Sequence, residues 1–127
     1  MKDFRELKVW EKARVLTLAV YKATENFPRQ ELYSLTNQIR RAAASVPTNI
    51  AEGCGKSSDP DFGRYLQIAM GSASELEYLL LLSRDLGYLA EASHRELSDN
   101  LIETRKMLNV LIQRVKSSRY KPMAKSS

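Results

Sequence analysis

Several residue types are scarce in this 127-residue sequence, and each scarcity excludes a class of protein. Cys54 is the only cysteine, so no disulfide forms within the chain and a reducing, cytoplasmic setting is expected. Five glycines and four prolines are too few for the many turns of a β-sandwich. The longest aliphatic run, Leu79–Leu82, is far too short to span a membrane, and the charged N-terminal residues do not form a signal peptide.

Residues suited to catalysis or metal binding are also scarce. His94 is the only histidine, and we interpret it as a partly buried residue near the start of the last helix. One histidine and one cysteine at unrelated positions do not form a zinc site. The Gly-Lys-Ser sequence after Cys54 lacks the earlier glycine and the preceding strand that a phosphate loop requires. We therefore predict a non-enzymatic protein without metal or cofactor.

Apolar residues recur with the period of an α-helix in four segments, at about residues 5–27, 29–53, 59–86 and 91–118. No segment shows the sustained alternation of a strand. Helices of this length, joined by short loops, predict an all-α protein with the architecture of an antiparallel up-down-up-down four-helix bundle. We expect this bundle to form one domain over residues 1–118.

Helix-breaking and helix-capping residues predict where the middle helices change. Pro47 removes a backbone donor inside the second segment and is expected to kink it. Gly53 and Gly55 are expected to end that helix. Ser58 or Asp59, with a proline in the first turn, is expected to begin the third helix.

The net charge of +5 is concentrated at one end of the sequence. Residues 114–127 contain five cations and no acid, which leaves 15 basic and 15 acidic residues in the rest of the chain. Residues 119–127 have no apolar periodicity and predict a basic, flexible tail. The basic character therefore belongs to a tail attached to a neutral body.

Three of the predicted helices carry side chains that a monomeric bundle does not need on those faces. Apolar residues point away from the core stripes of the last two helices, and neighbouring ones favour an oligomer interface over scattered exposure: Tyr78, Leu81, Leu82 and Val110. The second helix has a polar stripe that predicts either a hydrogen-bond network or a solvated face: Ser34, Gln38, Arg41, Ser45, Asn49 and Glu52. Gly71 within the third helix indicates close approach by another helix.

Basic residues indicate nucleic-acid binding through phosphates. The candidate contacts are Arg40, Arg41, Lys56, Arg64, Arg114, Lys116, Arg119, Lys121 and Lys125. In a lone chain, a solvated tail that aids solubility explains the last of these equally well. In a symmetric oligomer the tails lie side by side and form a strong phosphate-binding surface.

Several segments resemble one bacterial family. They are FRELKVWEKA at the start, QIRRAAASVPTNIAEG at Gln38–Gly53, GSASELE at Gly71–Glu77 and LGYL before the last helix. They are similar to the family named for proteins encoded in intervening sequences of 23S rRNA genes. The resemblance covers about residues 4–115. It implies a four-helix bundle that assembles as a homopentamer without known enzyme activity.

Two functional hypotheses follow from the residues and the resemblance together. The first is an oligomeric, non-enzymatic bundle that binds structured RNA or an RNA–DNA hybrid. The second is a protein-interaction scaffold, because related bundles are accessory proteins of diversity-generating retroelements that bind nucleic acid and a reverse transcriptase. A protein partner that stays bound after nuclease treatment favours the scaffold hypothesis. A salt-sensitive RNA complex favours the first hypothesis.

Overall fold

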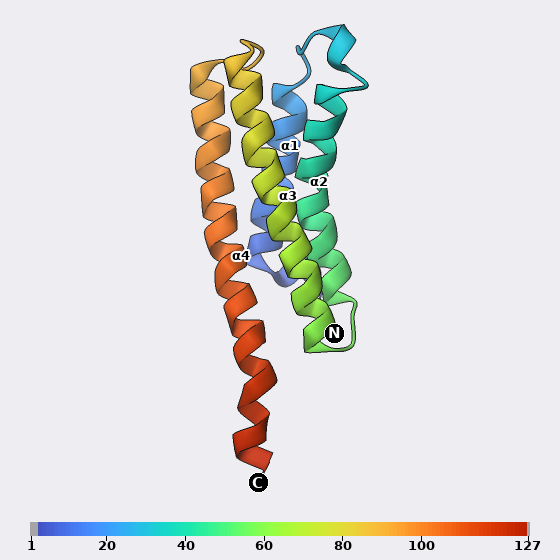
Figure 1. Cartoon of the computed structure of the whole chain (residues 1–127), viewed down its shortest axis with the longest axis vertical. Helices are drawn as coiled ribbons and strands as arrows, with labels where there is room; N and C mark the ends of the chain where they lie inside the picture. The colour runs from blue at the N-terminus through green and yellow to red at the C-terminus, as the bar shows by residue number, and fades with distance from the viewer. Residues whose placement is uncertain (1–2, 127) are drawn as a thin grey trace.

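The computed structural model describes residues 3–126, and it describes side chains as far as residue 117. The chain forms four long helices and two short 3₁₀ helices, in the order η1 (Phe4–Glu6), α1 (Lys8–Ala23), η2 (Arg29–Glu31), α2 (Leu35–Cys54), α3 (Asp59–Asp85) and α4 (Glu91–Ser126). Consecutive long helices run in opposite directions, and each packs against two others (Figure 1). The predicted all-α four-helix bundle is confirmed.

The core lies along the centre of the bundle and is almost entirely aliphatic. Every long helix contributes a stripe of residues spaced three or four positions apart. The largest fully buried side chains are Leu16, Ile39, Ile50, Leu66, Leu76, Leu80, Leu101 and Leu108. Burial of a leucine or isoleucine contributes about 1.5–3 kcal/mol relative to exposure, so these stripes dominate the stability of the fold.

The ends of α3 match their sequence signals. Ser58 caps the helix, because its Oγ accepts a hydrogen bond from the backbone nitrogen of Asp61 at 3.3 Å. A proline lies in the first turn, as predicted. Gly87 follows the helix with φ of +81°, a left-handed conformation that favours glycine, and turns the chain toward α4.

The first two predicted helices begin and end differently in the structure. The predicted segment 5–27 is divided, because Leu7 is extended between η1 and α1, and α1 ends at Ala23. The predicted segment 29–53 begins as η2, and the α-helix starts only at Leu35. Ser34 binds back to Glu31 through its backbone and its hydroxyl, so local hydrogen bonds compete here with helix formation.

Pro47 lies inside α2, which continues through it to Cys54. Proline has no N–H, so the carbonyl of Ala43, four residues earlier, lacks its usual helical donor. The hydroxyl of Thr17 on α1 lies 2.8 Å from the Ala13 oxygen of its own helix and 3.1 Å from the Ala43 oxygen, so the two carbonyls share its one proton. A side chain from the neighbouring helix therefore contributes a shared donor to the carbonyl that Pro47 leaves without a backbone partner.

The sequence predicted that Gly53 ends α2, but in the structure Gly53 is buried within the helix. A Cβ at this position would lie 3.0 Å from both Phe62 Cδ1 and Tyr65 Cβ on α3. The missing side chain lets the end of α2 pack closely against α3. Gly55, the next glycine, is the residue that follows the helix.

We expect Gly53→Ala to destabilise the fold by about 1 kcal/mol, because overpacking outweighs the better helix propensity of alanine. Gly71→Ala is the matched control, since nothing lies within 4 Å of a Cβ at that position. That substitution should stabilise the fold by about 1 kcal/mol through helix propensity alone. Urea unfolding measures both, and equal shifts in the same direction would contradict the packing explanation.

The last helix extends past the predicted boundary at residue 118. α4 continues to Ser126 and projects beyond the loop that joins α2 and α3 (Figure 1). The sequence predicted a flexible tail over residues 119–127 from the loss of apolar periodicity, which reports packing and not backbone conformation, and the flexibility of this segment stays a prediction.

Candidate nucleic-acid interface

The α2–α3 connection carries two cations that share one aromatic ring. Lys56 Nζ lies 5.1 Å from the centroid of the Tyr65 ring, and Arg64 Cζ lies 4.7 Å from it. Cation–π contacts of this kind restrain a cation without neutralising it. Arg64 also pairs with Asp61 at 3.7 Å, but both side chains are more than half exposed, so this pair is weak. The structure therefore brings two predicted contacts together.

Two more predicted contacts come from α4 at the same end of the bundle. Arg114 and Lys116 are exposed, and Lys116 lines one groove together with Arg64. Antiparallel packing of α3 against α4 brings these distant sequence positions side by side. The side chains of Arg119, Lys121 and Lys125 lie beyond those that the structure describes, so their role stays a prediction.

The adjacent arginines of α2 are placed elsewhere. Arg40 is tied to α1, because its Nε donates to Thr24 Oγ1 at 2.9 Å and its guanidinium lies 5.0 Å from the ring centroid of Tyr21. Arg41 is exposed and lines a groove of about 520 Å³ between α2 and α3. It lies roughly 20 Å along the helix axis from Cys54, the last residue of α2. Neither arginine joins the cluster around Tyr65.

The polar stripe of α2 forms a network at its centre only. Ser45 Oγ lies 2.8 Å from Ser72 Oγ on α3, and Asn49 Nδ2 donates to Ser45 Oγ at 2.9 Å. Ser34 bonds within its own segment, to Glu31. The remaining stripe residues are exposed and make no side-chain hydrogen bond or ion pair within residues 3–117: Gln38, Arg41 and Glu52. The α2–α3 contact encloses only the middle of the stripe, and water reaches its ends.

Comparison with known proteins identifies the family of this chain. A model of the 23S rRNA-intervening sequence protein family matches residues 5–110. The chain belongs to this family. The resemblance found in the sequence is thus confirmed, and the matched residues include all of α1, α2 and α3.

A solved structure from Bacteroides thetaiotaomicron has the same fold as this 23S rRNA-intervening sequence protein. It superposes with a TM-score of 0.74 at 28% identity, over 82% of this chain and 97% of the other. It is described as a protein of unknown function from the S23 ribosomal protein family. The comparison with curated proteins gives no match. Neither similarity names an enzyme.

The apolar residues predicted to form an interface are mostly exposed. Tyr78 is 60% exposed, Val110 is 51% exposed and Leu81 is 38% exposed. Leu82 is the exception, since it is half-buried and packs against the core. The prediction that Leu82 lies on the outer side of α3 was wrong. Its angle on the helix does not show how far a neighbouring helix extends over the edge of the core stripe.

The sequence interpretation missed an apolar groove between α1 and α2. It has a volume of about 570 Å³ and is lined in part by Phe4, Trp10, Leu18, Pro47 and Ala51. Leu18 is 57% exposed. The available signal in the sequence was the position of Leu18, which lies opposite the core stripe of α1. In the structure Trp10 is half-buried and packs edge-on against Phe4 at 4.9 Å between ring centroids.

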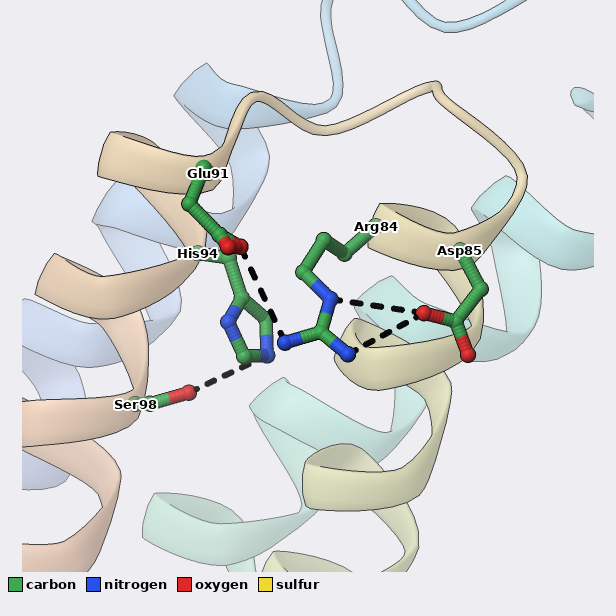
Figure 2. Close-up of polar contacts among 5 residues, drawn as sticks. All are labelled: Arg84, Asp85, Glu91, His94 and Ser98. Carbon is green, nitrogen blue, oxygen red and sulfur yellow. Dashed lines mark hydrogen bonds and ion pairs between the residues drawn. The ribbon is translucent and has the colours of Figure 1, made fainter.

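The opposite end of the bundle holds the only histidine (Figure 2). His94 is half-buried near the start of α4, as predicted, and its Nε2 lies 3.3 Å from Ser98 Oγ. Arg84 lies beside it and pairs with Asp85 at 3.1 Å and with Glu91 at 3.8 Å. Cys54 is buried at the other end of the bundle. The structure therefore does not bring cysteine and histidine together.

Two searches of the described residues bear on other classes of function. Among residues 3–126, no helix is long and apolar enough to cross a membrane. Within the same residues, no group of three histidine, cysteine, aspartate or glutamate side chains is arranged to hold a metal ion.

Glu31 connects the segment before α2 to the start of the α3–α4 turn. The Ser34 hydroxyl donates to Glu31 Oε1 at 2.8 Å and the Tyr88 hydroxyl donates to Oε2 at 3.0 Å. Both bonds lower the pKa of Glu31, and the bond from Ser34 is the larger cause. The Glu31 carboxylate in turn raises the pKa of Tyr88. The stabilisation from Glu31 is present at neutral pH and is lost as pH falls through its lowered pKa.

We expect Ser34→Ala to raise the pKa of Glu31 toward its ordinary value, and by more than Tyr88→Phe does, because the Ser34 bond is the larger cause. An NMR titration of the Glu31 carboxyl carbon in the three proteins measures this. An unchanged midpoint in both variants would show that these bonds do not form in solution.

Proposed function

We propose that this protein is a non-enzymatic, oligomeric bundle that binds nucleic acid, either structured RNA or an RNA–DNA hybrid, through its phosphates. The observation that carries the proposal is that Lys56 and Arg64 share the Tyr65 ring while Arg64 and Lys116 line one groove, at the end from which α4 projects. Cations held close together at the surface attract a phosphate chain, and binding releases its condensed counterions. The names of the family and of its solved relative, which refer to 23S rRNA and to a ribosomal protein family, support this direction.

The chemistry of the cluster favours phosphate contacts over base recognition. Lysine and arginine on an exposed helix end neutralise phosphates, whereas base readout needs side chains that enter a groove. The cations here surround a helix end and do not follow one face of a recognition helix. Binding should therefore depend weakly on sequence and strongly on salt.

Self-association is part of the proposal. Exposed apolar side chains on three helices support it, with Leu18 on α1, Tyr78 on α3 and Val110 on α4. The family resemblance implies a pentamer. A closed ring would repeat the cationic end once per subunit and multiply the local positive charge.

Two solution measurements test the proposal together. Light scattering should give a mass several times that of one chain at micromolar concentration. Fluorescence anisotropy with the nucleic-acid-free protein should detect binding to a labelled RNA hairpin at low salt. A monomer would exclude the oligomeric part, and the absence of any RNA or hybrid complex at low salt would exclude nucleic-acid binding.

A scaffold for a protein partner, such as a reverse transcriptase, is the second candidate function. The apolar groove between α1 and α2 favours it, because Leu18 and Pro47 offer uncharged surface that a phosphate chain does not use. This candidate predicts a complex with the partner that survives nuclease treatment. Leu18→Arg should weaken that complex, because it places a charge in the apolar groove.

A further inference from the structure

The groove between α1 and α2, called here the α1–α2 groove, offers apolar surface that the chain itself leaves uncovered. It has a volume of about 570 Å³, and Trp10, Leu18 and Pro47 are among the residues that line it. None of its lining residues is buried, and Leu18 is 57% exposed. Covering this surface with protein would remove apolar area from water, which favours a protein contact here.

A second groove, the α3–α4 groove, follows the edge where α3 and α4 meet. It has a volume of about 420 Å³, and none of its lining residues is buried: Met70, Ile102, Arg105, Lys106 and Asn109. Ile102 is 43% exposed. Both α1 and α3 pack against α2 and α4, so the two grooves lie on opposite sides of the bundle (Figure 1). The chain thus presents two different grooves with exposed apolar side chains, one on each side.

The two grooves also carry opposite net charge. In each groove the one arginine forms an ion pair with a glutamate of the same chain. The remaining charge is that of Glu52 in the α1–α2 groove and that of Lys106 in the α3–α4 groove. Neither of these two side chains has an ion pair within residues 3–117. Opposite charge favours contact between unlike grooves and disfavours contact between like grooves.

We propose that the α1–α2 groove of one copy binds the α3–α4 groove of a second copy. Leu18 of one copy then enters the α3–α4 groove of the next and packs against its apolar side chains. Because the two joined surfaces differ, each copy in a pair keeps one groove free, and further copies add until a ring closes. This inference rests on the self-association in the proposed function and names the two surfaces that carry it.

Two single variants each disable one groove. Leu18→Glu places an acid in the α1–α2 groove, and Ile102→Glu places one in the α3–α4 groove. Leu86→Glu is the matched control, because Leu86 is 49% exposed at the end of α3 and lines neither groove. Sedimentation measures assembly, and urea unfolding confirms that each variant is folded. We expect the dissociation constant to rise at least about a hundredfold in each groove variant and to stay unchanged in the control.

Mixing the two groove variants tests whether unlike grooves meet. Leu18→Glu keeps its α3–α4 groove and Ile102→Glu keeps its α1–α2 groove, so one intact contact can form between them. We expect a 1:1 dimer in the equal mixture, at concentrations where each variant alone is a monomer. A mixture that stays monomeric would overturn the pairing of unlike grooves.

The outcomes separate this inference from the proposed function. If the wild type assembles and either groove variant assembles as the control does, the inference is wrong and the proposed function stands. The groove of that variant would then be free for a different protein. If the wild type is itself a monomer, the self-association in the proposed function fails, and this inference fails with it.

Discussion

Deletion of residues 117–127 is expected to weaken RNA binding by on the order of a hundredfold at about 0.1 M salt. The deletion removes Arg119, Lys121 and Lys125 and leaves the last core residue, Val115, in place. Each phosphate contact contributes a nearly constant factor to affinity at a given salt concentration, so three lost contacts multiply. Fluorescence anisotropy with one RNA hairpin measures the ratio.

A helix-preserving variant distinguishes charge from length. Arg119→Gln/Lys121→Gln/Lys125→Gln keeps the backbone of α4 and removes the same three cations. Equal losses in the deletion and in the triple variant would show that charge is responsible. A loss of less than threefold in both would show that the projecting end of α4 does not contact the nucleic acid.

The second large effect concerns stability and involves Thr17. We expect Thr17→Val to destabilise the fold by about 1–2 kcal/mol, because it removes the hydroxyl shared by the Ala13 carbonyl and by the Ala43 carbonyl, which receives no N–H from Pro47. Valine has nearly the same shape as threonine, so packing is preserved. Urea unfolding of the full chain measures the change.

A double-mutant cycle with Pro47→Ala tests the cause. Alanine supplies the missing N–H to the Ala43 carbonyl, so Thr17→Val should cost less than half as much in that background. Equal costs in both backgrounds would show that the Thr17 hydroxyl does not act through this carbonyl.

Much of the fold follows from periodicity in the sequence, but its boundaries follow from contacts that periodicity does not report. The stripe through Leu66, Ala73 and Leu80 predicted the buried face of α3 correctly. The start of α2 depends on hydrogen bonds from Ser34 to Glu31, which compete with the helix.

Less of the candidate site was predictable, because it depends on which helices meet. The sequence does not show that Arg40 bonds to Thr24 on α1 or that Lys56 lies against Tyr65. The groove between Arg64 and Lys116 forms only because α3 and α4 are antiparallel neighbours. A helical wheel gives the angle of each residue but not the partner it meets there.

The salt dependence of RNA binding tests the central claim most directly. The affinity of the full chain is measured over a range of salt concentrations for two RNA hairpins of unrelated sequence. The phosphate-binding account predicts that log K falls with log salt with a slope of about −3 to −5, equal for both hairpins. A slope shallower than about −1, or a strong preference for one sequence that persists at high salt, would contradict it.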